Sequence, residues 1–283
     1  MSEPTGPRSS DAAIEIVGAE RLAELAALED VAEAVFGRGR RQTGWFQRKL
    51  IREGVEARLS SLAMVQRGAE PPSAAQVRGY ALLGRAPSRG TIARGAGVGV
   101  VEPLRGRKLG RALLEHSIDR ARAAGCEAVE YLAEPARLGW YLAQGFAVLE
   151  EQLTLHALGT GSPGATLDRD LTLSTLGPTR GHAQWSWIPE AWERTPTPER
   201  AFVEFEGARL WLTREGLAWL VHRCELNDPA TLLRDVASLR RRLAPTTPLL
   251  LYPCPAASAW TDALLQAGFD AAQRSFVVRR DTE

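Results

Sequence analysis

The sequence has few cysteines, little net charge and no long hydrophobic run. Its 283 residues include three cysteines and four histidines, and 35 basic against 34 acidic side chains give a net charge of +1. Cysteines this few and scattered form no disulfide framework, and the histidines show no metal-ligand spacing. A near-neutral chain lacks the positive field that holds nucleic acid. We therefore expect no metal and no nucleic-acid partner.

Membrane and export signals are also missing from the pattern. No apolar run approaches the roughly 20 residues that cross a bilayer, and the first twelve residues (MSEPTGPRSSDA) lack the apolar centre of a secretion signal. Cysteines in such a chain are expected to be small core residues in a reducing compartment. The expectation is a cytoplasmic protein without a membrane partner.

The chain has enough apolar material for more than one core. Hydrophobic residues make up 45% of it and charged residues 24%, and its length suits two domains of about 140 residues. A segment rich in Gly, Ser, Thr and Pro (LGTGSPGATL) has the composition of a linker. We expect a tail at 1–12, a first domain at 13–157, a linker at 158–169 and a second domain at 170–283.

The most informative stretch is residues 98–115, VGVVEPLRGRKLGRALLE. It begins as an apolar strand, breaks at Pro103, crosses a basic turn containing Gly106 and continues as an amphipathic helix. The first turn of a helix has unpaired N–H groups and partial positive charge, which together bind anions such as phosphate. The stretch therefore predicts a phosphate or pyrophosphate site.

Two familiar phosphate motifs are excluded. The glycines at 95, 97 and 99 have the wrong spacing for GxGxxG and lie inside an expected strand, and no GxxxxGK[ST] is present. A dinucleotide-binding domain or a P-loop NTPase is therefore not expected.

Hydrophobic periodicity gives the same order of elements twice. In the first half we expect strands at 14–17, 59–66, 77–84, 91–101, 127–132 and 146–156, and helices at 19–36, 45–51, 108–124 and 136–144. In the second half we expect strands at 171–176, 217–222, 249–252 and 276–279, a hairpin at 201–213, and helices at 229–243 and 256–267. The order helix, strand, helix, Gly-Phe and strand recurs about 123 residues on, at Gly145-Phe146 and Gly268-Phe269, which indicates an internal repeat.

Two motifs resemble those of the GNAT superfamily of acyl-CoA-dependent N-acyltransferases. The first is Arg105-Gly-Arg-Lys-Leu-Gly110, which resembles the family's Gln/Arg-x-x-Gly-x-Gly/Ala turn with Lys108 in place of a Gly. The second is Tyr141-Leu-Ala-Gln-Gly145-Phe146, which fits Tyr-x-x-x-Gly-Phe, although Glu134 replaces an Asn usual in the family. The resemblance implies an α/β (α+β) fold of two tandem GNAT-like domains. Each would be a mixed, mostly antiparallel sheet flanked by helices.

The resemblance also implies a site for acetyl-CoA as co-substrate. Strand residues would present backbone groups to the pantetheine arm, and the turn and helix start would hold the pyrophosphate. The residues concerned are Val98, Val100, Val101, Arg105, Gly106, Arg107, Lys108, Leu109, Gly110 and Arg111.

Two residues are candidates for catalysis. Tyr141 lies where the family's general acid usually protonates the CoA thiolate, but it could equally be an aromatic that packs against Phe146. Glu102 could accept the amine's proton directly or through water, or it could be a solvated carboxylate beside a loop.

The resemblance implies direct transfer of an acetyl group from acetyl-CoA to a primary amine on a small molecule or peptide. A non-catalytic module that binds acyl-CoA or a protein is the alternative. The second half has Leu264 at the position of Tyr141 and no Gly-rich turn, so we expect it to be a degenerate copy. The protein could be a monomer or a homodimer.

Overall fold

A computed structural model describes residues 13–37, 44–66, 72–85, 90–163, 183–184, 200–205, 208–226 and 229–283. The expected tail at 1–12 and the expected strand at 171–176 lie outside these residues, as do most of residues 182–192, a segment with three tryptophans. So do positions 164–169 of the expected linker and the hairpin turn at 206–207.

The first half forms its strands and helices close to where the hydrophobic pattern placed them. Its strands are β1 (Ile14–Gly18), β2 (Ser61–Val65), β3 (Val77–Arg85), β4 (Ile92–Val100), β5 (Ala128–Ala133) and β6 (Ala147–Leu158). Its α-helices are α1 (Glu29–Phe36), α2 (Trp45–Arg52), α3 (Leu109–Ala123) and α4 (Pro135–Leu142). Gly125 and Gly145 follow α3 and α4 with positive φ, as glycines do at helix C-termini.

The expected helix at 19–36 is wrong in its first half. Two short 3₁₀ turns (Ala19–Arg21 and Leu25–Leu28) precede α1 there. Leu22 and Leu28 are both buried in the core beneath the sheet. Periodic leucines mark a buried face, but a chain of successive turns can bury them as well as a helix can.

The second half repeats the later part of this order. It contains β7 (Ala183–Gln184), β8 (Arg200–Glu204), β9 (Ala208–Glu215), β10 (Ala218–Leu226), α6 (Pro229–Arg241), β11 (Pro248–Pro255), α7 (Ala259–Gln266) and β12 (Asp270–Asp281). The sequence β10-α6-β11-α7-β12 therefore mirrors β4-α3-β5-α4-β6. In each half, one pair of strands flanking a helical crossover is parallel: β4 with β5 and β10 with β11.

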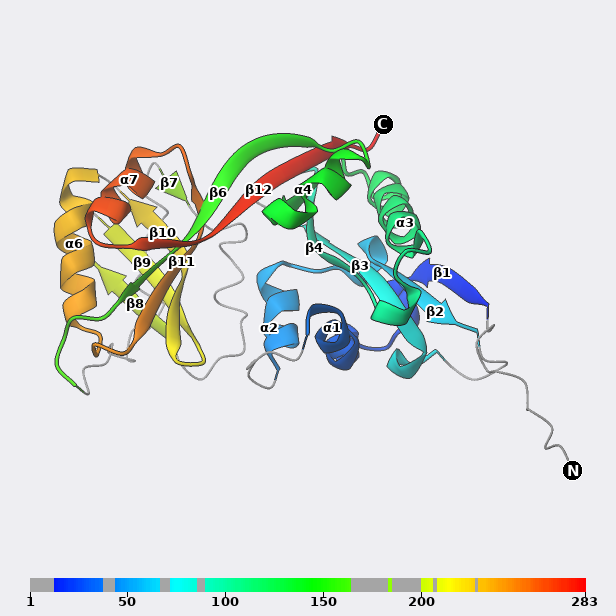
Figure 1. The fold of residues 1–283 in the computed structure, drawn as a ribbon, viewed down its shortest axis with the longest axis horizontal. Helices are drawn as coiled ribbons and strands as arrows, with labels where there is room; N and C mark the ends of the chain where they lie inside the picture. The colour runs from blue at the N-terminus through cyan, green and yellow to red at the C-terminus, as the bar shows by residue number, and fades with distance from the viewer. Residues whose placement is uncertain are drawn as a thin grey trace, which may run out of the picture.

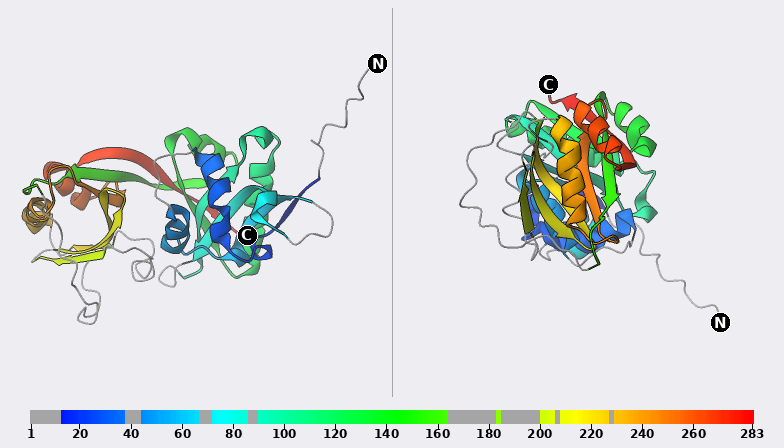
Figure 2. Two further views of the ribbon diagram at one scale, coloured as in Figure 1. Left: turned by 90° about the horizontal axis from the view of Figure 1, so that it is seen from below. Right: turned by 90° about the vertical axis from the view of Figure 1, so that its left-hand side faces the viewer.

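All the strands belong to one mixed, mostly antiparallel sheet flanked by helices. Its order is β1-β2-β3-β4-β5-β12-β6-β11-β10-β9-β8, with β7 beside the end of β10. The long strands β6 and β12 form an antiparallel ribbon that joins the two halves, visible in Figure 1 and from the side in Figure 2. The sequence led us to expect two separate sheets, and this ribbon makes them continuous.

The ribbon exchanges strands between the halves. β12, the last strand of the chain, pairs with β5 of the first half through Phe276 to Asp281. β6, from the first half, pairs with β11 of the second half. Each half thus receives one strand of its sheet from the other.

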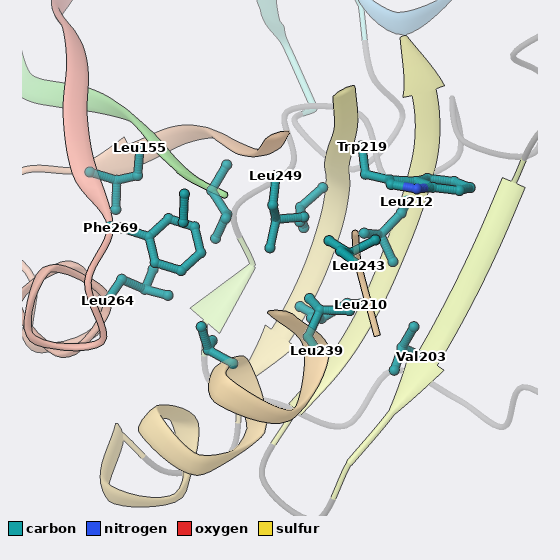
Figure 3. Close-up of a cluster of buried hydrophobic side chains, with 14 of the residues drawn as sticks. Leu155, Val203, Leu210, Leu212, Trp219, Leu239, Leu243, Leu249, Leu264 and Phe269 are labelled. Carbon is teal, nitrogen blue, oxygen red and sulfur yellow. The ribbon is translucent and has the colours of Figure 1, made fainter. Parts of the chain in front are cut away.

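Apolar clusters lie on the helix-covered faces of the sheet. In the first half, α1 and α2 cover one face and α3 and α4 the other (Figure 1). In the second half, α6 and α7 pack on the sheet through residues such as Leu239, Leu243 and Leu264, and Phe269 closes the cluster (Figure 3). Cys126 and Cys254 are both buried, as expected of small core residues.

Candidate active site

Strands β4 and β5 separate part-way along their length. They are paired only from Ile92 to Arg94 on β4 and from Ala128 to Glu130 on β5, although β4 continues to Val100. We call this unpaired stretch, residues 95–100 of β4 and 131–133 of β5, the β4–β5 opening. It is closed at Gly95 and extends about 17 Å along β4, at roughly 3.3 Å per residue.

A β-bulge bends β4 within this opening. The register with β3 shifts between Leu82, which pairs with Gly97, and Leu83, which pairs with Gly95, so that Ala96 is the extra residue. Gly97 has φ of 134°, a conformation that residues with a side chain rarely adopt. A bulge turns backbone groups out of the ladder and makes them available to a ligand.

The wide end of the opening leads to the N-terminus of α3. A short 3₁₀ turn, Glu102–Leu104, follows β4, and residues 105–108 connect it to the helix. The first backbone bond of α3 joins the Ala112 N–H to the Lys108 carbonyl at 3.1 Å. The N–H groups of Leu109, Gly110 and Arg111 therefore have no partner within the helix, which makes this end suitable for an anion.

Lys108 is the N-cap residue of α3 and has a left-handed backbone with φ of 61°. This conformation suits Gly, which explains why a Gly would be favourable at this position. The Lys108 side chain is exposed, so it adds a positive charge beside the helix start without being packed into the protein.

Arg105 is committed to the protein itself. Its Nε donates to the carbonyl oxygen of Val100 and its Nη2 to that of Val35, both at 3.0 Å. The side chain therefore holds the end of β4 against the end of α1. Arg107, Lys108 and Arg111 are exposed around the helix start.

Glu102 lies directly after β4 and is exposed. Its place beside the mouth of the opening agrees with either role that the sequence left open. Among the residues that the structure describes, no partner selects one of these roles, so the part of Glu102 in catalysis stays a prediction.

Tyr141 belongs to an aromatic cluster on α4 and the neighbouring strands. Its ring centroid lies 4.9 Å from that of Trp140, 5.2 Å from Tyr131 and 5.5 Å from Phe146. The Tyr141 side chain is 7% exposed. Burial raises the pKa of its phenol, and the nearby carboxylate of Glu134 raises the pKa further. The packing role and a hydrogen-bond role are therefore both available to this tyrosine.

The two sequence motifs meet in the structure. A Cβ built on Gly110, at the start of α3, would lie 3.8 Å from Trp140 of α4 and 3.9 Å from Val100 of β4. The start of α3, the end of β4 and the aromatic helix α4 therefore come together within contact distance.

The sequence reasoning did not single out Tyr131. This residue stands on β5 opposite Gly95, at the first position where the two strands are no longer paired. A Cβ on Gly95 would overlap its ring, so Gly95 is required for Tyr131 to cross the gap. The signal was present as the glycine at 95, which was considered only as part of a nucleotide-binding motif.

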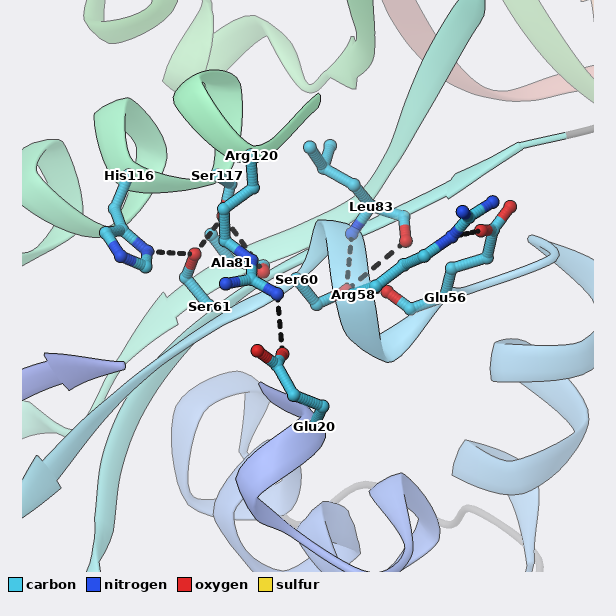
Figure 4. A network of polar contacts seen from close by, with 10 residues as sticks. All are labelled: Glu20, Glu56, Arg58, Ser60, Ser61, Ala81, Leu83, His116, Ser117 and Arg120. Carbon is cyan, nitrogen blue, oxygen red and sulfur yellow. Dashed lines mark hydrogen bonds and ion pairs between the residues drawn. The ribbon is translucent and has the colours of Figure 1, made fainter. Parts of the chain in front are cut away.

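Polar contacts fix α3 against the sheet (Figure 4). Ser61 Oγ of β2 lies 2.8 Å from His116 Nδ1, and the Ser117 hydroxyl donates to Ser61 Oγ at 2.8 Å. Burial lowers the pKa of His116. Arg120, one turn later, is paired with Glu20 at 2.6 Å. These contacts fix the direction in which the start of α3 points.

In the second half, β10 and β11 also pair over only part of their length, but an apolar residue stands at the position that matches Tyr141. β10 and β11 pair only from Trp219 to Val221 and from Leu249 to Leu251. Leu264, which matches Tyr141 in the repeat, is fully buried in the apolar cluster. The residues before α6, Asn227 and Asp228, lie outside the described part of the chain.

Within the described ranges, no group of three or more His, Cys, Asp or Glu side chains could hold a metal ion. None of the helices in that part of the chain is long and apolar enough to span a membrane.

Comparison with known proteins identifies the fold. Residues 45–146 match the family model described as Acetyltransferase (GNAT) family. The chain has the GNAT fold. The match covers the β4–β5 opening, α3 and Tyr141, and it ends at Phe146. Comparison with curated proteins gives no match.

Solved GNAT-like structures resemble the chain over nearly its full length. A candidate acetyltransferase from Pyrococcus horikoshii gives a TM-score of 0.60 at 10% identity, covering 100% of this chain and 93% of its own. A GCN5-related N-acetyltransferase from Sphaerobacter thermophilus gives a TM-score of 0.56 at 12% identity, and the alignment covers 95% of this chain and 96% of that protein. A GCN5-related N-acetyltransferase from Anabaena variabilis gives a TM-score of 0.58 at 13% identity, and the alignment covers 96% of this chain and 73% of that protein. At such identities the likeness concerns the fold.

Proposed function

We propose that the protein is an N-acetyltransferase that transfers an acetyl group from acetyl-CoA to a primary amine by direct attack. The observation that carries the proposal is the meeting of Gly110, Trp140 and Val100. It joins an anion-binding helix end to an open strand pair and to a buried tyrosine. The match of residues 45–146 to the acetyltransferase family supports the same chemistry.

The residues present fit acetyl-CoA. The unpaired N–H groups at the start of α3 and the exposed Arg107, Lys108 and Arg111 would hold the pyrophosphate. Backbone groups of Val98, Val100 and Val101 would bind the pantetheine arm as an added strand would. Arg105 keeps the end of β4 in place through its two hydrogen bonds.

Acetyl-CoA, when bound, would supply a thioester whose C–S bond breaks as the C–N bond to the amine forms. Backbone N–H groups of the bulged β4 would stabilise negative charge on the carbonyl oxygen. We place this donor on the bulged part of β4, within residues 96–100. Glu102, directly or through water, would accept the proton that the attacking amine loses.

Tyr141 would donate a hydrogen bond, and finally its proton, to the departing sulfur. Its raised pKa keeps the phenol protonated at neutral and mildly alkaline pH, so the donor is present throughout that range. The same shift makes complete proton transfer to a thiolate uphill. Tyr141 therefore acts first as a hydrogen-bond donor to the developing charge.

The second half would be a degenerate copy that completes the first sheet and has no acyl-CoA site of its own. Leu264 at the position of Tyr141 supports this division. The acceptor would be an amine on a small molecule or a peptide, and the reaction would take place in the cytoplasm. The domain limits proposed are residues 13–157 and 170–283.

Titration calorimetry of the full chain with acetyl-CoA, followed by a thiol-release assay over a panel of amines, tests the proposal. We expect binding and amine-dependent release of CoA. Binding without release for any amine would favour the non-catalytic module. Failure to bind acetyl-CoA would contradict both the enzyme and the acyl-CoA-binding module.

Tyr141→Phe tests the role of the hydroxyl. We expect turnover to fall roughly a hundredfold, because a positioned acid contributes about 10²–10⁴-fold, while CoA affinity changes less than about twofold. Steady-state kinetics and calorimetry measure the two quantities. An unchanged turnover would leave Tyr141 with the packing role alone.

A further inference from the structure

Tyr131 spans the closed end of the β4–β5 opening. It stands on β5 directly after the last paired residue, Glu130, and its ring lies over Gly95 of β4. The ring carbon that carries the hydroxyl is among the atoms that a Cβ on Gly95 would overlap. The hydroxyl therefore lies beside β4, although the residue belongs to β5.

This hydroxyl is buried and has no hydrogen-bond partner among the described residues. Tyr131 is 2% exposed. Burying a hydroxyl without a partner is unfavourable, because its hydrogen bonds to water are lost and not replaced, and buried polar groups are nearly always paired in folded proteins. An apolar ring of the same size would avoid this cost, so the hydroxyl calls for an explanation.

The geometry of the opening supplies one. The start of α3 lies beyond Val100, at the wide end, and Tyr131 lies at the closed end beside Gly95, about 17 Å from Val100 measured along β4. A ligand held by its pyrophosphate at α3 and extended along β4 would place its far end against Tyr131. For acetyl-CoA, the far end is the acyl thioester.

We propose that Tyr131 binds the acyl group of the donor, its hydroxyl donating a hydrogen bond to the acyl thioester and its ring limiting the length of the acyl chain. This inference rests on the proposed acetyl-CoA site. Burial raises the pKa of Tyr131 well above its ordinary value, so the hydroxyl keeps its proton and can donate a hydrogen bond. The centroid of its ring lies 5.2 Å from that of Tyr141 and 5.9 Å from that of Phe146, and this packing fixes the position of the ring.

Tyr131→Phe tests whether the Tyr131 hydroxyl binds the ligand or is simply buried without a partner. The variant keeps the ring and removes an unpaired group, so the ligand-free protein should melt at the same temperature or higher. The dissociation constant for acetyl-CoA should rise about tenfold, the loss of one hydrogen bond to a buried partner. The constant for CoA, which has no acyl group, should change less than about twofold.

Tyr80→Phe is the matched control. Tyr80 is a fully buried tyrosine of β3 that packs with Phe46 in the cluster beneath α1 and α2. Removal of the Tyr80 hydroxyl should leave the affinities for acetyl-CoA and for CoA unchanged. Equal acetyl-CoA affinity in wild type and Tyr131→Phe would overturn the inference while leaving the proposed function standing. Absence of acetyl-CoA binding by the wild type would overturn both.

A second variant tests the limit on chain length. Tyr131→Leu keeps an apolar side chain but shortens it at the closed end of the opening. The ratio of butyryl-CoA to acetyl-CoA affinity should rise several-fold. An unchanged ratio would show that the ring does not bound the acyl group.

Discussion

Single residues determine whether the start of α3 can serve as an anion site. Lys108 holds a left-handed conformation at the helix N-cap, a region that costs a non-glycine residue about 1–2 kcal/mol. Its exposed side chain leaves the turn open, so the backbone geometry that a Gly would give is preserved. The strain is a local cost for keeping a positive charge at this point.

Lys108→Gly should therefore stabilise the ligand-free protein, by up to about 1 kcal/mol, since relief of strain exceeds the added flexibility of the unfolded chain. Denaturant unfolding measures the change. Arg107→Gly is the control, because Arg107 has no positive φ, and we expect it to be neutral or destabilising. Stabilisation of both variants alike would show that strain at Lys108 is not the cause.

The sequence predicted the residues at the wide end of the opening better than the residue at its closed end. The turn from Arg105 to Gly110 is contiguous and carries a recognisable spacing. Tyr131 acquires its position only from pairing with β4 across 36 residues of chain, and a glycine opposite an aromatic cannot be read without the register. Long-range register is set by the fold as a whole.

At the scale of elements, α3 and α4 are held together by the last strand of the chain. Arg280 of β12 donates to both carboxylate oxygens of Glu115 on α3, at 2.8 and 3.0 Å. It also donates to the carbonyl oxygen of Gln144, after α4, at 2.9 Å. Hydrogen bonding to Arg280 lowers the pKa of Glu115, and hydrogen bonding to Glu115 raises the pKa of Arg280.

Arg280→Gln should destabilise the protein by about 1 kcal/mol at pH 7, the value for a well-oriented, partly exposed ion pair. Glu115 has a lowered pKa when folded, so this stability is complete above its ordinary pKa of 4.5 and disappears as the pH falls through the folded value. The difference in melting temperature between wild type and variant should therefore shrink below about pH 4.5.

Arg274→Gln is the control on the same ribbon. Arg274 is paired with Glu151 but is 62% exposed, so its loss should cost less than about 0.5 kcal/mol. If the difference in melting temperature between wild type and Arg280→Gln stayed constant from pH 7 to pH 3.5, the role given to ionised Glu115 would be contradicted.

Elements whose apolar residues repeat on one face were predictable from the sequence. Elements that become strands only through pairing with another strand were not. α3 was expected at 108–124 and runs from Leu109 to Ala123. β12 was expected only at 276–279, but it begins at Asp270. Its first five residues (DAAQR) are exposed, so no alternation marks them, and pairing with β6 makes them a strand.

At the scale of the whole molecule, the two halves share their sheet. β6 is bonded to β11 and β12 is bonded to β5, so neither half contains all the strands of its own sheet. The sequence repeat predicted equivalent elements in each half. It could not predict the exchange, because β6 and β12 occupy equivalent positions and the same pattern fits either pairing.

Shared strands predict that the halves unfold together. Leu264→Ala, in the core of the second half, should cost about 2–5 kcal/mol through its cavity. We expect amide hydrogen exchange in β5 to accelerate along with exchange in β11. Leu113→Ala, in the core of the first half, is the reciprocal test. Unchanged protection of β5 in the Leu264→Ala protein would show that the halves are independent.

The exchanged strand also sets an order of events during biosynthesis. The partner of β5 ends at Asp281, 148 residues after Ala133, the last residue of β5. At roughly 5–20 residues per second, a ribosome takes about 7–30 s to make that interval. Throughout this time, the nascent first half has β5 as an uncovered edge beside a helix pair that Arg280 has not yet joined. A chain that stops short of β12 therefore leaves the half with the candidate site unfinished, and translation must pass Asp281 before that half can mature.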